Sequence, residues 1–415
     1  MTNSTTFPGT VTATSYEGSG ANLTGISAGF DPDVDIIAIG NGAGTTTQGA
    51  DAIAIGHDAG SSGTQGTRAI AIGKQAGQAT QGDNCVAVGT NAGYNAQGAQ
   101  GTAIGGFAGY TDQGAFAVAV GYAAASGSQG DNAVAVGYQA GKSGQITEAV
   151  AVGYNAGCNA QGQGAVAIGK DAGCGDQAND SIAIGTRAGR VNQQNGGVAI
   201  GTNAGSNTQA TFGIAIGTNA GCNAQGSYGI AIGNEAGSAD QASESIAVGN
   251  QAGKVSQALA CIAIGSISGY TSQGNFGISI GYAAGNGTQG SDCVAIGRTA
   301  GYNAQGANAV AVGNNAGRAD QGSWSVAVGQ YAGYNNQGVN AVAIGNSAGY
   351  SNQGDNAIAI GLSAADTSQP TNTFRTRLGS VRDANGQEYL HITNTGELVR
   401  GNGYSDDRLK YDEKF

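Results

Sequence analysis

The chain repeats one short pattern, Val/Ile-Ala-Val/Ile-Gly-x-x-Ala-Gly, from Gly40 to Gly361. We call the glycine that follows the Val/Ile-Ala-Val/Ile triplet the marker glycine. It recurs every 16 residues, with a single 17-residue step from Gly56 to Gly73, and 21 marker glycines fit this spacing. A fixed period of this length is typical of a solenoid, in which each unit buries its apolar face only by stacking on its neighbours. The sequence therefore predicts a rod of 21 coils of 16 residues.

A short strand-like triplet precedes each marker glycine. The residues three and one positions before the glycine are Val or Ile, except at Thr102, and the residue between them is Ala, except at Ser279. β-Branched residues favour a pleated strand, and alternation places the branched pair on one face and the small residue on the other. We expect the branched pair inside the coil and the alanine column outside. Because the following glycines allow sharp corners, we predict an all-β parallel β-solenoid, that is, a β-roll or β-helix.

A glutamine column runs through all 21 repeats, eight residues after the marker glycine, or nine in the repeat with the inserted residue. Equivalent positions in a parallel solenoid stack about 4.8 Å apart, so side-chain amides can form a hydrogen-bonded ladder. A buried amide without partners would cost about 1–3 kcal/mol. We interpret the column as a structural ladder that fixes the register, and a row of ligand-binding amides is the alternative. The ladder begins with Gln48, Gln65, Gln81, Gln97, Gln113, Gln129, Gln145 and Gln161.

The energetics of one coil favour association. Two buried aliphatic side chains contribute roughly 1.5–3 kcal/mol each, whereas ordering the backbone costs roughly 1–2 kcal/mol for every residue. Ladder hydrogen bonds reduce the deficit, but further burial is needed. A uniform column of alanines on the outer face suits close approach by a second copy, so we predict association along the whole rod through that face.

Composition excludes several classes of protein. Glycine makes up 78 of the 415 residues without the every-third-position spacing of collagen. The formal net charge is −11, so we expect no nucleic-acid partner, because phosphate contacts need clustered Lys and Arg. Residues 1–14 are polar and lack the apolar core of a signal peptide, and no run of 18 apolar residues occurs. We therefore expect synthesis in a cytoplasm and no membrane insertion.

The six cysteines occupy columns that otherwise vary, and we expect free thiols. Only Cys158 and Cys174 lie on adjacent coils, within disulfide range if the geometry allows. No C-x-x-C pair occurs, and the two histidines, His57 and His391, are isolated. We therefore expect neither a metal site nor a cofactor.

Tyrosine recurs five residues after the marker glycine. Rings stacked along such a column cover a thin sheet and stabilise it, and we favour this structural interpretation. The alternative is an adhesive face whose rings stack on sugars. The six tyrosines of this column are Tyr94, Tyr110, Tyr270, Tyr302, Tyr334 and Tyr350.

The composition changes after Gln369, the last glutamine of the column. Residues 370–404 combine apolar strand-like runs with turn sequences, which predicts a small β-structured cap on the last coil. We divide the chain into an N-terminal attachment segment (1–35), the rod (36–369), the cap (370–404) and a terminal motif (405–415).

The repeat is similar to the head repeat of trimeric autotransporter adhesins. That resemblance implies a left-handed parallel β-roll packed as a homotrimer. Bacterial members of the family also carry a signal peptide and a membrane-anchoring β-barrel, and we expect neither here. The fold is expected to carry over, whereas the secretion route is not.

Two terminal motifs resemble parts of viral fibres. Residues 16–26 resemble a short glycine-serine-leucine-threonine element near the start of fibre segments in phage and large-virus tail or spike proteins. Residues 405–410, Ser-Asp-Asp-Arg-Leu-Lys, resemble the opening of the intramolecular chaperone of endosialidase-type tailspikes, which trimerises the fibre and then cuts itself off. The resemblance implies Ser405 as nucleophile, Lys410 as base and a cut between Tyr404 and Ser405. Because the family domain extends well beyond this motif, we do not expect the 415-residue chain to cut itself.

Together these features predict a trimeric viral fibre or spike. It would be made in the host cytoplasm, join the virion through its N-terminal segment, and attach to a host glycan or protein receptor. The alternatives are a non-viral trimeric surface adhesin and, less favoured, a β-helix enzyme such as an acyltransferase, which needs a catalytic histidine beside a cofactor cleft. Apart from self-cleavage, we expect no enzymatic activity.

Overall fold

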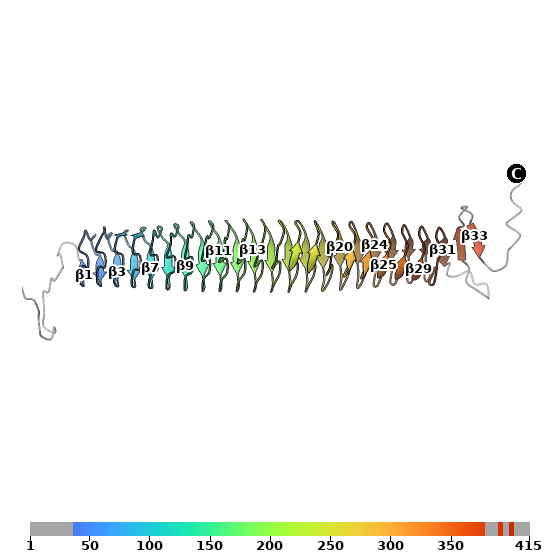
Figure 1. The fold of residues 1–415 in the computed structure, drawn as a ribbon, viewed down its shortest axis with the longest axis horizontal. Helices are drawn as coiled ribbons and strands as arrows, with labels where there is room; N and C mark the ends of the chain where they lie inside the picture. The colour runs from blue at the N-terminus through green and yellow to red at the C-terminus, as the bar shows by residue number, and fades with distance from the viewer. Residues whose placement is uncertain (1–35, 378–388, 393–397, 402–415) are drawn as a thin grey trace, which may run out of the picture.

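The computed structural model describes residues 36–377, 389–392 and 398–401, which form a rod of coils stacked along one axis (Figure 1). Each triplet strand pairs in parallel with the equivalent strand of the next coil in unchanged register, as Ile214 does with Ile230. The predicted all-β parallel β-solenoid is confirmed. None of the described segments is helical, and none is therefore a helix that could cross a membrane.

One wall of the rod, which we call the aliphatic wall, consists of the Val/Ile-Ala-Val/Ile triplets. Its strands are β1 (Ile37–Ile39), β2 (Ile53–Ile55), β3 (Ile70–Ile72), β5 (Val86–Val88), β7 (Thr102–Ile104), β8 (Val118–Val120), β9 (Val134–Val136), β10 (Val150–Val152), β11 (Val166–Ile168), β12 (Ile182–Ile184), β13 (Val198–Ile200), β14 (Ile214–Ile216), β15 (Ile230–Ile232), β17 (Ile246–Val248), β19 (Ile262–Ile264), β20 (Ile278–Ile280), β22 (Val294–Ile296), β24 (Val310–Val312), β26 (Val326–Val328), β28 (Val342–Ile344) and β30 (Ile358–Ile360).

The opposite wall, which we call the glutamine wall, is built around the glutamine column. Some coils contribute only a single parallel bridge, such as that between Gln113 and Gln129, and others a short strand. The strands are β4 (Thr80–Gln81), β6 (Ala96–Gln97), β16 (Ala239–Gln241), β18 (Val255–Gln257), β21 (Thr288–Gln289), β23 (Ala304–Gln305), β25 (Ala319–Gln321), β27 (Asn335–Gln337) and β29 (Ser351–Gln353).

The aliphatic wall continues into the predicted cap. Strand β31 (Phe374–Arg377) pairs in parallel with β30, with Phe374 opposite Ile358, so it keeps the 16-residue step. Strands β32 (Tyr389–Ile392) and β33 (Leu398–Gly401) then add antiparallel pairings. The described strands of the cap therefore extend the sheet that they follow.

The prediction of which strand face is buried was wrong. Alanines of the triplets, such as Ala215 and Ala231, are fully buried, whereas Ile216 and Ile232 remain 36% and 37% exposed. Among the described residues, the buried apolar side chains are all Ala or Cys, and the largest fully buried side chains are all Gln. The walls lie too close together to hold branched side chains, so these point outward. The alanine column is consequently the core of a single chain and is not available to a second copy.

Close stacking of the coils explains the marker glycines. Gly217 has a φ of +127°, and a Cβ there would lie 2.5 Å from the carbonyl oxygen of Gly233 in the next coil. The second glycine of the corner is required for a different reason. Gly221 has a φ of +50°, and a Cβ there would lie 2.9 Å from Oε1 of Gln225. One glycine therefore admits the next coil, and the other leaves room for the glutamine side chain.

Each core glutamine joins both walls. Nε2 of Gln209 lies 2.9 Å from the carbonyl oxygen of Val198 in the aliphatic wall and 2.9 Å from that of Gly213. It also donates to Oε1 of Gln225 at 3.0 Å, while Gln193 donates to Oε1 of Gln209 at 3.0 Å. The column thus forms a link across the core and a ladder along the axis. The ladder is interrupted after Gln161, Gln305, Gln321 and Gln353, whose amides donate only to backbone carbonyls.

The single serine in the alanine column of the triplets enters this ladder. Ser279 Oγ donates to Oε1 of Gln289 at 2.7 Å and lies 3.3 Å from Nε2 of Gln273, which donates to it. The hydroxyl therefore bridges two successive glutamines. These two hydrogen bonds explain why serine can replace alanine here, because Oγ is the only heavy atom that serine adds.

Gln209→Ala should destabilise the rod strongly. The change removes an amide that bonds to both walls and leaves buried groups unpaired, each at about 1–3 kcal/mol. Asn207→Ala, on the exposed surface of the same coil, is the matched control and should cost less than about 1 kcal/mol. Urea denaturation followed by circular dichroism measures both free energies of unfolding. Equal stability of the two variants would contradict the structural importance of the ladder.

Candidate functional site

The glutamines predicted as a ladder lie inside the rod. Those from Gln65 to Gln161 are at most 3% exposed, and Gln48, in the first coil, is half-buried. Gln48 donates to Gln65 at 2.6 Å, and Gln97 donates to Gln113 at 3.0 Å. Buried amides that bond to one another and to the backbone are not accessible to a ligand, so the outer columns are the place to look for binding sites.

The predicted tyrosine column lies on the corner that joins the end of the aliphatic wall to the glutamine wall. All six rings are half-buried. Tyr94 and Tyr110 stack with ring centroids 4.8 Å apart, and Tyr334 and Tyr350 stack at 4.9 Å. The column is therefore a set of short ladders and not one continuous row.

Cations extend these short ladders. Nζ of Lys254 lies 5.5 Å from the ring centroid of Tyr270. The guanidinium of Arg318 lies 5.3 Å from the ring centroid of Tyr302 and 5.4 Å from that of Tyr334, and it donates to the Tyr334 hydroxyl at 3.0 Å. Contacts of this kind stabilise the surface by roughly 0.5–1 kcal/mol each. Most of the predicted tyrosines thus already have neighbours in the column.

One ion pair connects two adjacent coils on this corner. Lys254 lies 2.8 Å from a carboxylate oxygen of Glu235, and Gln251 donates to the same carboxylate. The hydrogen bond from Lys254 lowers the pKa of Glu235, and the same bond raises the pKa of Lys254. The contribution of Glu235 to stability is therefore present above the ordinary carboxyl pKa and is lost as the pH falls through the lowered one. Both groups contact solvent, so the contribution is small.

A second aromatic ladder was not predicted from the sequence. Tyr122, Tyr138 and Tyr154 each follow a marker glycine directly, in three successive coils. Their ring centroids are 5.5 Å and 5.1 Å apart, and Lys170 lies over Tyr154 at 5.9 Å. The recurrence of tyrosine at one register position was the signal that could have revealed it.

A cleft opens between this ladder and the first tyrosine pair. Phe107 and Tyr110 lie on one side, and Gln139 and Lys142 lie two coils further along. The coil between them contributes Tyr122 and two small residues, Ala123 and Ser126. The cleft has a volume of about 320 Å³. We call it the aromatic cleft, and its lining residues are Phe107, Tyr110, Tyr122, Ala123, Ser126, Gln139 and Lys142.

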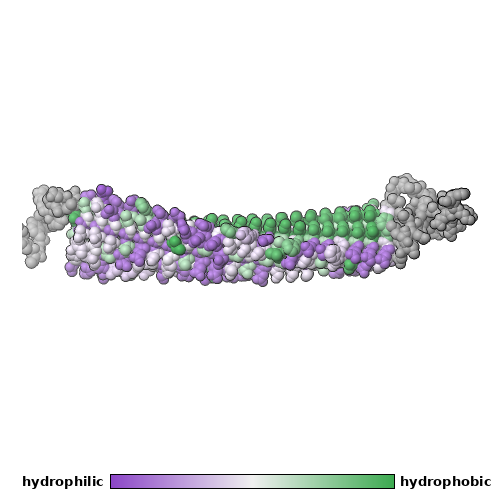
Figure 2. Space-filling model, turned by 90° about the horizontal axis from the view of Figure 1, so that it is seen from above, coloured by the Kyte–Doolittle hydropathy of each residue, from purple (hydrophilic) through white to green (hydrophobic). Residues whose placement is uncertain are grey.

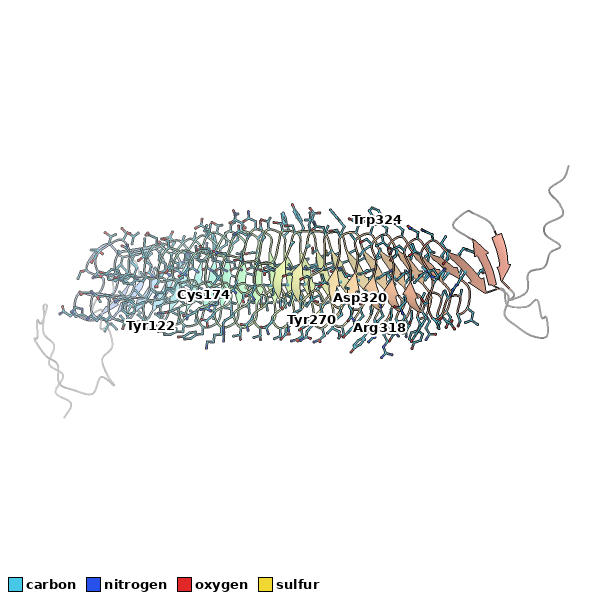
Figure 3. All side chains as sticks on the ribbon, turned by 45° about the vertical axis from the view of Figure 1, so that its right-hand side comes forward. Tyr122, Cys174, Tyr270, Arg318, Asp320 and Trp324 are labelled. Carbon is cyan, nitrogen blue, oxygen red and sulfur yellow. A yellow bond between two sulfur atoms is a disulfide. The ribbon has the colours of Figure 1, made fainter. Side chains whose placement is uncertain are left out.

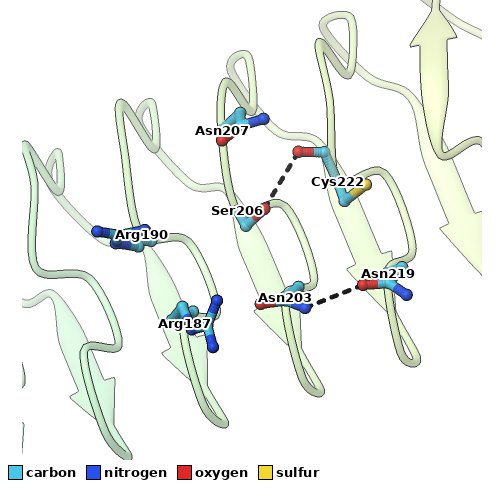
Figure 4. Close-up of a pocket in the computed structure, with 7 residues that line it drawn as sticks. All are labelled: Arg187, Arg190, Asn203, Ser206, Asn207, Asn219 and Cys222. Atoms are coloured by element: carbon cyan, nitrogen blue, oxygen red, sulfur yellow. Dashed lines mark hydrogen bonds between the residues drawn. The ribbon is translucent and has the colours of Figure 1, made fainter.

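A second cleft, of about 260 Å³, lies further along the same corner (Figure 4). We call it the arginine cleft, because Arg187 and Arg190 stand at one end of it. Asn203 donates to an amide oxygen in the next coil at 3.0 Å, and Ser206 donates to a backbone carbonyl at 3.3 Å. The arginine cleft is polar and has no aromatic wall. Its lining residues are Arg187, Arg190, Asn203, Ser206, Asn207, Asn219 and Cys222.

The other corner of the coil carries exposed aromatic residues. Figure 3 places Trp324 on the edge of the rod opposite Tyr270 and Arg318. These aromatic residues stand five positions before a marker glycine, have positive φ values and are at least half exposed. They are Phe116, Phe212, Tyr228, Phe276 and Trp324. No described cleft is associated with them.

The cysteines only partly follow the expectation of free thiols. Cys158 and Cys174 form a disulfide between adjacent coils, with Cα atoms 4.7 Å apart, because stacking brings equivalent positions to this distance. The other four are free: Cys85, Cys222, Cys261 and Cys293.

The last two expectations from the sequence concern metal binding and self-cleavage. No group of three or more His, Cys, Asp or Glu side chains that could hold a metal ion occurs in the described part of the chain. Tyr404, Ser405 and Lys410, the predicted cleavage residues, lie outside the described residues.

Comparison with known proteins gives no relative. No protein-family model, no curated protein and no solved structure matches the chain. The chain is a parallel β-solenoid repeat protein, and its function has to be inferred from its surfaces.

The free cysteines should differ sharply in reactivity. Cys85, Cys261 and Cys293 are buried, and burial raises the pKa of each thiol. Burial also raises the pKa of Cys222, which is only half-buried. Iodoacetamide at neutral pH should therefore modify Cys222 first and leave the buried three intact, because the thiolate is the reactive form. Peptide mass spectrometry measures this, with unfolded protein as the control in which all four react. Equally fast labelling of Cys261 and Cys222 would contradict it.

Proposed function

We propose that the chain forms the rod of a homotrimeric fibre or spike that projects from a virion and serves in host attachment. The supporting observation is the outer surface of the aliphatic wall. It is apolar over the whole series of coils, which is unusual for a surface that stays in water.

Two columns of branched side chains cover this wall. Figure 2 shows them as parallel green rows over the C-terminal part of the rod. The residues three positions before the marker glycines are half-buried, and the isoleucines one position before them are the more exposed. A continuous apolar surface of this kind marks an interaction site. Isoleucines of this column that are at least 36% exposed are Ile39, Ile72, Ile104, Ile168, Ile200, Ile216, Ile232, Ile264, Ile296, Ile344 and Ile360.

Other copies of the same chain are the partner that fits this surface. A partner that covers the whole wall needs the same coil spacing over the same length, and a second copy of this chain meets both requirements. The core of one chain holds only small side chains and glutamines, so burial of the aliphatic wall would supply the apolar area that the single coil lacks. Three walls facing a common axis would cover one another, in agreement with the resemblance to trimeric autotransporter heads.

The viral assignment rests on the two terminal motifs, residues 16–26 and 405–410, which lie outside the described residues. A non-viral trimeric adhesin would share the rod and the apolar wall. The two hypotheses differ in whether the terminal motif begins a self-cleaving chaperone, so the trimer and the cleavage need separate tests.

The first test is the oligomeric state. Sedimentation equilibrium should give about three times the 40.3 kDa mass of the chain. A variant with Ile200→Glu, Ile216→Glu and Ile232→Glu should lose association, because each buried isoleucine contributes roughly 1.5–3 kcal/mol and the added carboxylates would be desolvated.

The matched control carries Thr202→Glu, Thr218→Glu and Asn234→Glu. These exposed residues lie on the same three coils, two positions further along the chain. Both variants stack three carboxylates within one chain, so only the loss of the apolar wall distinguishes them. A folded monomeric wild type, or a control that dissociates as readily, would refute the proposed interface.

The second test concerns cleavage. In a form of the protein extended by its natural downstream sequence, Ser405→Ala or Lys410→Ala should leave the chain intact, whereas the parent is cut after Tyr404. Acyl transfer needs both the hydroxyl nucleophile and its base. Intact mass measurement distinguishes the products, and a cut that persists in Ser405→Ala would show that the resemblance to tailspike chaperones does not extend to mechanism.

A further inference from the structure

We infer that the aromatic cleft binds a pyranose ring that carries a carboxylate. This inference gives the chemistry of the receptor contact in the proposed function and rests on it only for biological context. The site itself is argued from the geometry of three neighbouring coils.

The cleft is a missing position in an aromatic ladder. Tyr94 stacks on one face of Tyr110, with ring planes 12° apart. The next residue in this column is Ser126, which is too small to continue the stack, and the one after it is Lys142. Coils stack at the separation of aromatic rings, so the free face of Tyr110 borders a space one ring thick. A ligand about one ring thick, such as a pyranose, can take the place of the missing ring.

Two more rings shape the same space. The Phe107 ring lies 5.7 Å from Tyr110 and 5.9 Å from Tyr122, nearly edge-on to the latter. Ala123, which is 7% exposed, lies in the column of Phe107 and leaves the space open. Ring faces carry negative charge density and attract the polarised C–H groups on one side of a sugar ring. Apolar walls with few polar groups are typical of small-molecule sites.

The polar groups of the cleft come from the third coil. Gln139 offers both a donor and an acceptor for ring hydroxyls. Lys142 is half-buried, and none of the ion pairs among the described residues involves it. A single unpaired ammonium beside an aromatic wall, in a chain with a net charge of −11, favours a ligand with one negative group.

Other ligands fit less well. A nucleic acid could stack on the rings, but its phosphates need clustered cations, and this cleft has one. A purely apolar peptide would leave Lys142 and Gln139 unused. The arginine cleft has more positive charge but no ring on which a sugar can stack. The volume of about 320 Å³ lies in the range of small-ligand sites, roughly 300–1,000 Å³.

Carboxylated pyranoses occur in two kinds of glycan, with terminal sialic acids or with uronic acids inside a polymer. We would measure binding to the full chain by isothermal titration calorimetry with 3′-sialyllactose and with a hyaluronan tetrasaccharide. Lactose and chitotetraose are the neutral counterparts. At least one acidic probe should bind, and its neutral counterpart should not.

Ser126→Tyr tests the missing position directly. The column holds tyrosine in six other coils, so the variant should fold, and its ring should fill the cleft and abolish binding. Lys142→Gln should weaken binding roughly 10- to 100-fold through loss of a charge-assisted hydrogen bond. Phe276→Ala is the matched control, because this exposed ring lies on the other corner of the coil and does not line the cleft. It should bind as the wild type does.

Absence of binding by the folded wild type, unchanged binding in Ser126→Tyr, or equal binding of neutral and acidic probes would each overturn the inference. Sedimentation equilibrium on the same samples separates it from the proposed fibre. A trimer without binding refutes the cleft alone, whereas a monomer that binds the acidic probe refutes the trimer and supports the cleft.

Discussion

The glutamine that links the two walls sets the cross-section on which the rest of the structure depends. Its amide must reach a carbonyl of the aliphatic wall from the glutamine wall, as Gln209 does at 2.9 Å from Val198. That reach holds the walls so close that only Ala, Ser, Cys and Gly fit beside it. The branched residues are consequently excluded from the interior. The apolar surface that drives the proposed trimer is thus a result of the polar link inside each chain.

The solenoid, its period, its register and its glutamine column were predictable, because each appears as an unbroken pattern in the sequence. The direction of the strand faces was not, because hydrophobicity alone assigned the larger side chains to the core. The position two residues before the triplet alanine held the missing information. It shares a strand face with that alanine and is occupied by small residues such as Ala117, Cys261 and Gly213, all fully or nearly buried. A strand face that carries small residues at both positions leaves no room for branched side chains in the core.

The aromatic cleft was harder to predict for a different reason. Tyr94 and Tyr110 were identified from a single column. Phe107 lies in another column of the Tyr110 coil, and Lys142 lies two coils further along, so only the fold brings them to the same cleft. Columns two and five residues after the marker glycine are brought together by the buried Ala-Gly pair between them. A cleft formed by a missing ring also has no sequence motif of its own. Ser126 marks the cleft only once the positions of the neighbouring rings are known.

The proposed trimer interface and the proposed binding cleft use separate columns of the same repeat. The aliphatic wall and the glutamine core use positions that hardly vary from coil to coil, whereas the corner positions carry residues as different as Tyr, Lys, Arg, Ser, Cys and Asn. Corner side chains contribute little to the core, so a ladder can be continued or interrupted there without changing the register. Both clefts lie where a serine, Ser126 or Ser206, follows a large side chain in the tyrosine column. Substitutions at the corner can therefore change the clefts while the aliphatic wall, the proposed trimer interface, stays the same.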